Sequence, residues 1–447
     1  MPKLEIGDKL INLFCRPNAK GCYNLPEDYP QEWEQFKEYN ARDVEAVREI
    51  WHKLQRYPMP ETEWLFYRLD QHINQHGVRI DRPFVEQAIL LKDKHQEKDL
   101  ARFQQLTGLS SANSDARMKV WLESKGVHPQ NLQESTINAI ISTVSGTVKE
   151  ALQLRQQLRK NSLAKYQTML DSANGEDRLQ GMFRFYGAHT GRWTSKQVQL
   201  QNLPRNRLKN LDAARGSVLR GDSPELITIL YDQPADVLSQ LVRTAFIPKD
   251  GCVFYVADYA AIEARVLAFF AGETWRMQAF AADEDIYCSS ASQMFGVPVS
   301  RDGPNSHLRQ KGKIAELALG YGGGSAALIR MGALQLGLSK KDVSDLVYRW
   351  KKANPHITAF WRTIDQAVQQ AIRQKTTVPL GRFTISYLGE VLAIRLPSGR
   401  SLYYRDPALQ KKQKDIYFVY NGSTESGQYT QVHSYGARVV ENLCQAA

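Results

Sequence analysis

The segment from Cys252 to Gly272, CVFYVADYAAIEARVLAFFAG, most constrains the fold of this 447-residue chain. Val253 to Ala257 is a short apolar run rich in β-branched and aromatic residues, which predicts a buried strand. Asp258 follows this run directly, and Ile262 and Val266 then begin a helical spacing. The segment therefore predicts a strand that gives way to a helix, with a carboxylate at the junction.

Two interpretations of Asp258 are open at this point. A carboxylate at such a junction is open on one side and can bind a hard divalent cation, which prefers oxygen ligands and often bridges to phosphates. The alternative is that Asp258 caps the helix that follows, a very common role of Asp. Taken alone, the segment favours the cap.

A second segment, from His307 to Gly324, places Arg309, Lys313, Leu317 and Tyr321 four residues apart. Each step of four turns a helix by about 40° net, so these side chains form one slowly drifting stripe roughly 18 Å long. The Arg fork and the mobile Lys charge suit a triphosphate, and the apolar and aromatic residues suit a sugar and a base. The alternative is an amphipathic helix with two solvated basic residues. The glycines that follow indicate a flexible terminus, and a Walker loop is excluded because no Gly-Lys-Ser/Thr follows them.

The charge balance favours a polyanionic partner. Lys and Arg total 58 against 47 Asp and Glu, a net charge of +11, which is typical of proteins that bind nucleic acid or an anionic membrane. The longest apolar stretch, Val266 to Ala271, is far shorter than the roughly 20 residues of a spanning helix, so no membrane partner is expected. The start of the chain has no apolar signal segment, and the five cysteines are scattered, so we expect reduced thiols and a cytoplasmic location.

Basic residues gather at Arg155, Arg159, Lys160 and Lys165. Positions 155 and 159 are one helical turn apart and share a face. A solvated helix face is the simpler interpretation, and a face that follows a phosphate backbone is the alternative if other sites indicate nucleic acid.

Three motifs in order resemble those of the family A DNA polymerases, the DNA polymerase I type. DYAAIEAR at 258–265 is similar to motif A, Asp-Tyr-Ser-x-Ile-Glu-x-Arg, and the Arg309, Lys313, Tyr321-Gly322 spacing is similar to motif B. GAHTGRWTSKQVQLQNLPR at 187–205 resembles the Thr-Gly-Arg and Leu-Gln-Asn-hydrophobic-Pro signature that precedes motif A. The variant ELALGYGGG is most like phage-type members.

The resemblance implies an α+β right-hand polymerase fold with a mixed α/β palm that carries an antiparallel sheet. It assigns 1–56 to a remnant of a 3′-to-5′ exonuclease domain, 57–175 to a helical thumb, 176–272 to the first part of the palm, 273–425 to helical fingers and 426–447 to the start of a second palm segment. Independently, apolar spacing predicts one helix from Glu32 to Arg56 and a helical region that continues to about Met169.

The resemblance also implies roles for individual residues. Asp258 and the backbone carbonyl of Tyr259 would bind metal, with two Mg²⁺ ions expected in a complete site. Glu263 would be the steric gate that excludes a ribose 2′-hydroxyl. Arg309 and Lys313 would hold a deoxynucleoside triphosphate, and Lys313 would donate a proton to the leaving pyrophosphate.

Further residues would contact the primer-template DNA or the base. Tyr321 would lie near the templating base, and the DNA contacts would come from Arg192, Gln201, Asn202 and Gln445. Leu317 stands where the family usually has Phe or Tyr, so sugar discrimination by that ring cannot be carried over. The implied reaction is an in-line attack of a primer 3′-hydroxyl on the α-phosphate.

One departure from the family pattern is serious. The family's motif C, His-Asp-Glu among apolar residues, supplies a second metal-binding aspartate, and no His-Asp dipeptide occurs in this chain. We therefore expect severe loss of activity in the isolated chain. Two alternatives follow: a non-catalytic DNA-binding remnant, or one half of a split polymerase that a C-terminal fragment completes in trans.

Two further alternatives concern neighbouring activities. Tyr39 and Asp43 resemble the third exonuclease motif, but taken alone this spacing is far more often that of a structural helix, and only its place ahead of a thumb favours the motif. Residues 1–38 contain no Asp-x-Glu triplet, so we expect no proofreading. A single-subunit RNA polymerase shares the palm plan, but a bulky Glu263 gate opposes ribonucleotides.

Overall fold

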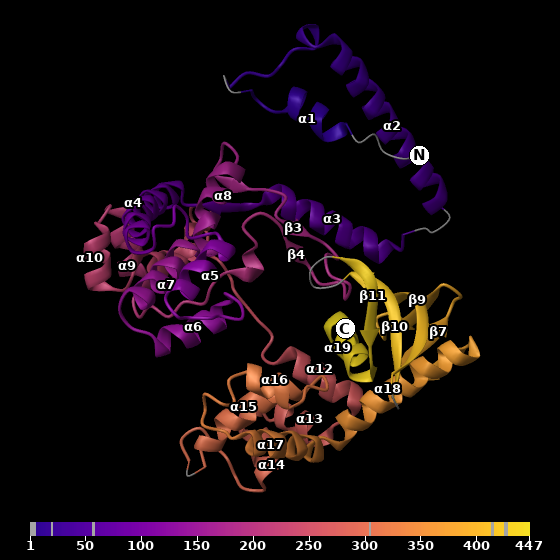
Figure 1. Ribbon diagram of the computed structural model, residues 1–447. Coiled ribbons are helices and arrows are strands. Elements are labelled where there is room, and N and C mark those ends of the chain that lie inside the picture. The colour runs from indigo at the N-terminus through magenta and orange to yellow at the C-terminus, as the bar shows by residue number, and fades with distance from the viewer. Residues whose placement is uncertain (1–5, 19–20, 56–58, 304, 413–414, 424–427) are drawn as a thin grey trace. The chain divides into compact units, whose positions relative to one another are not determined.

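A computed structural model describes residues 6–18, 21–55, 59–303, 305–412, 415–423 and 428–447 (Figure 1). Contacts divide the chain into two units, Met1–His72 and Ile73–Ala447. The expected boundaries at 56/57 and 425/426 fall outside the described residues. No helix among the described residues is both long and apolar enough to cross a bilayer.

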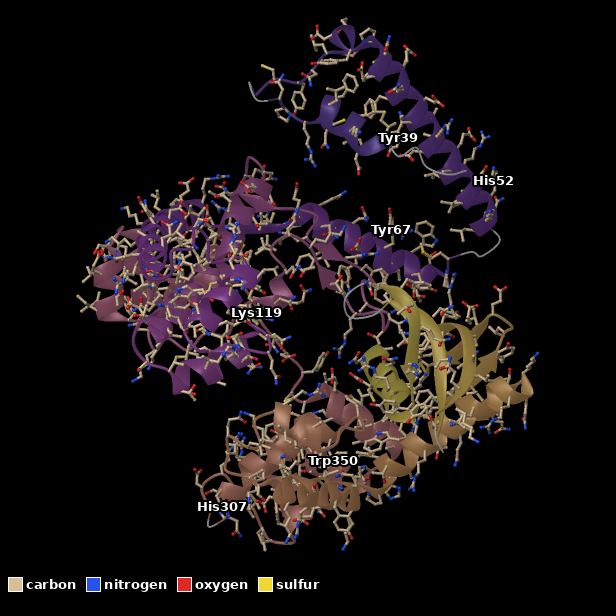
Figure 2. The ribbon with its side chains drawn as sticks, in the orientation of Figure 1. Tyr39, His52, Tyr67, Lys119, His307 and Trp350 are labelled. Atoms are coloured by element: carbon tan, nitrogen blue, oxygen red, sulfur yellow. The ribbon has the colours of Figure 1, made fainter. Side chains whose placement is uncertain are left out.

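The first unit is a small helical unit with an aromatic centre. Its elements are α1 (Gly7–Cys15), the 3₁₀ helix η1 (Pro26–Asp28), α2 (Pro30–Leu54) and the first part of α3 (Glu61–His76). The Phe14 ring lies 5.1 Å from Trp33 and 5.5 Å from Phe36, so these rings fasten α1 to α2. The helix expected over Glu32 to Arg56 is confirmed as far as Leu54 by α2, which carries Tyr39, while Arg56 lies outside the described residues (Figure 2).

The second unit opens with helices around two apolar cores, both of which include residues of α4, and the helical region expected to reach about Met169 is confirmed. Asp81 and Ser114 cap α4 and α5 by accepting hydrogen bonds from Phe84 N and Arg117 N. The helices are α4 (Arg82–Thr107), α5 (Asp115–Ser124), α6 (Glu134–Thr143), α7 (Gly146–Leu158), η2 (Asn161–Leu163) and α8 (Ala164–Ser172).

Short strands and helices follow in the region expected to be mixed. β1 (Val78–Ile80) pairs antiparallel with β2 (Arg178–Leu179) and with β5 (Phe246–Ile247). The remaining elements are β3 (Phe183–Arg184), β4 (Thr194–Ser195), η3 (Leu200–Asn202), α9 (Leu211–Leu219), α10 (Pro224–Leu230), α11 (Pro234–Leu241) and η4 (Val242–Ala245).

A larger core lies among the helices that carry the second motif. Trp350, fully buried, lies among them (Figure 2). The helices are α12 (Ile262–Ala271), α13 (Thr274–Ala281), α14 (Ile286–Phe295), α15 (His307–Leu319), α16 (Ser325–Arg330), α17 (Lys340–Ala353) and α18 (Pro355–Gln374).

An antiparallel sheet of six strands occupies part of the region expected to be helical fingers, so the helical assignment of 273–425 is wrong from residue 377 onward. Turn glycines 381, 389 and 399 adopt φ between 56° and 87°, which suits tight hairpins. Helices α18 and α19 (Gly436–Ala446) cover one face of the sheet (Figure 1). The strands are β6 (Thr377–Leu380), β7 (Phe383–Tyr387), β8 (Val391–Arg395), β9 (Ser401–Lys412), β10 (Asp415–Ser423) and β11 (Tyr429–Ser434).

The strand expected over Val253 to Ala257 is also wrong. These residues form no strand, and the Tyr255 and Val256 side chains are 96% and 92% exposed. An apolar run becomes a buried strand only when a neighbour satisfies its backbone groups and covers its side chains. No strand pairs with the run within the described residues.

Candidate functional site

The site is built on α15, whose sequence divides the helix into a buried face and an open stripe. Leu308, Gly312, Ile314, Ala315 and Leu319 are buried against neighbouring helices. Arg309 and Lys313 are partly exposed and Leu317 is 55% exposed. The stripe expected from the spacing is therefore confirmed for these three residues, whereas Tyr321 follows the end of the helix.

The Arg309 guanidinium is held by a carboxylate that was not predicted from the sequence, that of Asp285. Its Nε and Nη2 donate to Asp285 Oδ2 at 3.0 and 2.8 Å, and its guanidinium lies 5.4 Å from the centre of the Tyr287 ring. Hydrogen bonding to Asp285 raises the pKa of Arg309, so this side chain is a fixed cation.

Asp285 also caps α14 by accepting from Tyr287 N and Cys288 N. Partial burial opposes ionisation of Asp285, but hydrogen bonds from Arg301 and Arg309 outweigh burial and lower its pKa. The one sequence signal that could have identified Asp285 is its place before a helical run, because Asp is a common N-cap residue. Lys313, by contrast, forms no ion pair with any described residue, so its charge stays open to a ligand.

Tyr321 lies in the segment after α15, next to Gly322, which approaches α19. Its hydroxyl is buried without a hydrogen bond to a described residue, and burial, followed by the nearby Cys444 and Glu263, raises its pKa. Gly322 adopts φ +77°, and a Cβ there would lie 2.7 Å from Ala437 Cβ. The backbone after α15 therefore approaches α19 as closely as a glycine allows.

Arg192 and Glu263, predicted from separate motifs, meet directly. Arg192 Nη2 lies 2.5 Å from Glu263 Oε1, and both side chains are about half exposed. Glu263 belongs to the first turn of α12. Since Glu263 also contributes to the pKa of Tyr321, the structure brings three predicted residues together.

Three other predicted DNA contacts lie on exposed or partly exposed positions. Gln201 and Asn202 are exposed on η3, where Asn202 Nδ2 donates to Gln199 Oε1 at 3.3 Å. Gln445 is partly exposed on α19 and donates to Glu441 Oε1 at 3.2 Å.

Asp258 and Tyr259 lie apart from any other set of metal ligands. Both are exposed, and α12 begins later with Ala261 as its first flanking residue, so Asp258 is not the helix cap. No three His, Cys, Asp or Glu side chains converge in the described part of the chain. One exposed carboxylate does not fit a site for two Mg²⁺ ions, which needs several protein and substrate oxygens.

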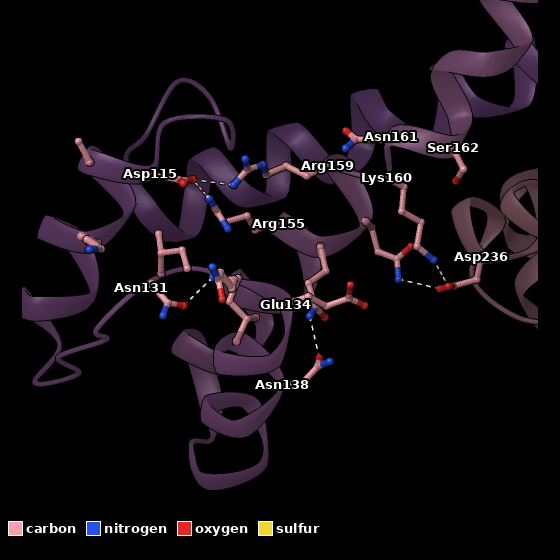
Figure 3. A pocket seen from close by; sticks show the side chains of 17 residues that line it. Asp115, Asn131, Glu134, Asn138, Arg155, Arg159, Lys160, Asn161, Ser162 and Asp236 are labelled. Carbon is pink, nitrogen blue, oxygen red and sulfur yellow. Dashed lines mark hydrogen bonds and ion pairs between the residues drawn. The ribbon is translucent and has the colours of Figure 1, made fainter. Parts of the chain in front are cut away.

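The basic stretch near residue 155 is not an open phosphate-binding face. Arg155 is 2% exposed and, with Arg159, is bonded to Asp115, while Lys160 is bonded to Asp236 (Figure 3). Lys165 donates to a backbone carbonyl, that of Val198. Helical periodicity placed these cations on shared faces but could not reveal carboxylates that arrive from distant segments.

Comparison with known proteins supports the motifs. The model of DNA polymerase family A matches residues 114–386, which is more than half of the chain. The DNA polymerase of Bacillus phage SP02 is 43% identical over 455 residues, covering 99% of this chain and 70% of the phage protein. The thermostable DNA polymerase I of Thermus filiformis is 24% identical and covers 68% of this chain, but the match spans only 34% of that protein.

A solved structure shares the fold at low sequence identity. The POL domain of Pol1 from M. smegmatis, in complex with DNA primer-template and dNTP, has a TM-score of 0.53 at 17% identity. The match covers 83% of this chain and 54% of that one. With the family match over 114–386 and the phage relative along nearly its whole length, this α+β chain belongs to DNA polymerase family A.

Proposed function

We propose that this chain carries out DNA-templated DNA synthesis by adding deoxynucleotides to a primer 3′-hydroxyl. The observation that carries the proposal is the open stripe of α15. There a carboxylate-held Arg309 shares one face with Lys313, which pairs with no carboxylate of a described residue. Two cations so placed suit a triphosphate, because phosphoryl transfer depends chiefly on positioning and charge stabilisation.

The resemblance of the three motifs to those of the family supports the roles that we propose for individual residues. Arg309 would bind phosphate oxygens, and Lys313 would give a proton to the leaving pyrophosphate. Leu317 would contact the sugar and Tyr321 would border the templating base. Primer-template DNA would be contacted by Arg192, Gln201, Asn202 and Gln445.

Glu263 would exclude ribonucleotides. Its carboxylate is fixed by Arg192 at 2.5 Å, and a fixed carboxylate blocks a 2′-hydroxyl more effectively than a mobile one. Incorporation of ribonucleotides and deoxynucleotides at equal rates would overturn this role and favour an RNA polymerase.

Family A polymerases in general use divalent metal ions. Asp258 and the Tyr259 carbonyl are the oxygen ligands that we propose for this chain, with Mg²⁺ as the ion. Asp258 belongs to no cluster of three or more potential metal ligands among the described residues.

The isolated Asp258 supports a second candidate function, a chain that binds primer-template DNA without extending it. The net charge of +11 suits DNA binding in either case. In a third arrangement, a separate C-terminal polymerase fragment completes the metal site of this chain. Adding such a fragment to the primer-extension assay would test it.

Primer extension and DNA binding, measured on the same protein, distinguish these functions. We expect Lys313→Ala to reduce kcat by about 100-fold or more, the usual size of a general-acid contribution. Lys311→Ala is the matched control, because Lys311 lies on another face of α15, against the Phe295 ring. Wild-type protein that binds primer-template but never extends it would favour the second candidate, and equal kcat for both variants would remove Lys313 from the site.

A further inference from the structure

A buried ion pair lies beside the open stripe. Arg276 of α13 and Glu316 of α15 form two parallel hydrogen bonds, Nη1 to Oε2 and Nη2 to Oε1, each of 2.6 Å. Their side chains are 1% and 6% exposed. Such a planar, two-point contact fixes orientation as well as distance.

The pair is satisfied on every side by residues from other helices. Glu316 Oε1 also accepts from Ser290 Oγ of α14 at 2.6 Å and from Trp350 Nε1 of α17 at 3.0 Å. Arg276 Nε donates to Asn354 Oδ1 at 2.5 Å. One carboxylate therefore ties α15 to three neighbouring helices.

Aromatic rings enclose the Arg276 guanidinium. It lies 4.8 Å from the Trp275 ring and 5.4 Å from the Trp350 ring, distances at which a cation is attracted to a ring face. Burial alone would raise the pKa of Glu316, but the charge of Arg276 and the hydrogen bonds from Arg276, Ser290 and Trp350 lower it. The pair is thus held in its ionised form.

The position of Glu316 on α15 explains how the ion pair can restrict the rotation of this helix. Residue 316 follows Arg309 by seven positions, and so lies about 20° from it around the helix axis; Lys313 is about 60° away. Leu308, Gly312 and Ala315 form the buried face on the other side of Glu316. Glu316 therefore occupies the border between the buried face and the stripe, where a small rotation of α15 would move Arg309 and Lys313 together.

Stability alone does not explain a buried pair. Two charges lose their hydration on burial, and well-packed apolar residues of similar volume are often equally stabilising. What apolar residues cannot supply is the angular restriction of a bidentate contact with two further donors.

We propose that the Arg276–Glu316 pair is a positioning device that sets the rotation of α15, so that Arg309 and Lys313 meet a nucleoside triphosphate together. The proposal rests on the proposed function, because it assigns the triphosphate to that face. Glu316 and Arg276 act through α15 and do not touch the substrate.

The decisive variant replaces both charges by apolar residues, Arg276→Met with Glu316→Leu. We expect this variant to fold with a lower unfolding midpoint, because the Ser290, Trp350 and Asn354 side chains lose their hydrogen-bond partner. In the folded variant, the equilibrium affinity for a deoxynucleoside triphosphate on a primer-template should weaken about tenfold. KM for the triphosphate should rise by a similar factor, and affinity for the primer-template itself should not change. Wild-type triphosphate affinity in this folded variant would overturn the proposal.

A milder variant covers the case in which the double variant does not fold. Trp350→Phe keeps an aromatic ring in place and removes the one hydrogen bond to Glu316, so triphosphate affinity should fall about twofold to threefold. An unchanged affinity would count against the proposal. Asp345→Asn is the control, because Asp345 pairs with Arg349 on the exposed surface of α17.

The binding measurement separates this proposal from the proposed function. If the wild type binds triphosphate but does not extend the primer, DNA synthesis fails as the function while the variants still test the positioning of α15. If the wild type extends the primer and the variants bind triphosphate equally well, only the positioning proposal fails. A wild type that binds no triphosphate overturns both.

Discussion

Helix α15 and the run from Val253 to Ala257 carry neighbouring parts of one predicted site, yet they are supported in opposite ways. α15 packs one face against neighbouring helices and is locked by a buried carboxylate, that of Glu316. The run before Asp258 has no secondary structure and leaves two large side chains almost wholly exposed. The cations of the site are therefore rigidly placed, and its carboxylate is not.

The difference lies in where each element finds its hydrogen bonds. A helix satisfies most of its backbone groups within itself, so a local pattern is enough to define it. A strand must find a neighbour, and a local pattern carries no information about whether one is present. A local pattern therefore sufficed to predict the packed helix, whereas the apolar run before Asp258 is an exposed segment.

The largest change in the free energy of unfolding is expected for a substitution in α15, at the buried carboxylate of Glu316. Glu316→Gln leaves Arg276 buried without a counter-charge, which should cost about 3–5 kcal/mol of the free energy of unfolding at pH 7. Because the folded protein lowers the pKa of Glu316, the carboxylate stabilises the fold fully above its unfolded pKa of about 4.3. That stability is lost as the pH falls through the lower, folded pKa.

Urea denaturation of the wild type and Glu316→Gln at pH 7, 5, 4 and 3 measures this dependence. The two free energies should converge only below about pH 4.3, where the unfolded carboxylate takes up its proton. A constant difference at every pH would show that Glu316 acts through packing and not through its charge.

A second pair of substitutions compares burial directly. Ile314→Ala removes a side chain that is 3% exposed within the larger core and should cost about 2–5 kcal/mol. Phe254→Ala removes a larger side chain that is 53% exposed and should cost less than about 1 kcal/mol. Equal losses in chemical denaturation would mean that the run before Asp258 is packed after all.

A third prediction concerns the close packing of α15: Gly→Ala should destabilise the protein there and stabilise it in a less crowded helix. A Cβ at Gly312 would lie 2.2 Å from the Tyr287 carbonyl oxygen of α14, so Gly312→Ala should destabilise by about 1–3 kcal/mol. Gly216→Ala is the matched control in α9, where a Cβ would meet only the end of the Arg220 side chain at 3.4 Å. There, better helix propensity should stabilise by about 0.5–1 kcal/mol. Thermal unfolding of both variants shows whether each substitution lowers or raises the unfolding midpoint.

The smallest change in the free energy of unfolding is expected in the exposed run from Val253 to Ala257. Tyr255→Ser and Val256→Ser should each change the free energy of unfolding by no more than about 0.5 kcal/mol, because surface side chains without partners contribute little. A loss of more than about 2 kcal/mol in either variant would reverse the comparison, since it would require a neighbour that covers the run.

The sequence predicted those features that depend on neighbouring residues. The stripe of Arg309, Lys313 and Leu317 and the long helix α2 came directly from periodicity. The partners of these residues could not be predicted, because Asp285 is 24 residues from Arg309 and Arg276 is 40 from Glu316. Such distances require the tertiary fold.

The six-stranded sheet was missed for a different reason. Phe383 and Ile385 are buried and alternate with less buried residues, and glycines mark the turns, so the signal was present. The family pattern of helical fingers was extended over it. Composition misled the interpretation of Val253 to Ala257, where apolar character was taken as burial.

The order of that sheet has a consequence for how the chain folds. Its strands lie side by side as β11-β10-β9-β8-β7-β6, so each pairs with the strand before or after it along the chain. Every closure joins nearby segments, and little loop entropy opposes it. We therefore expect this meander to form early and quickly, and to offer α18 and α19 a finished surface on which the slower, long-range contacts of the larger core are completed.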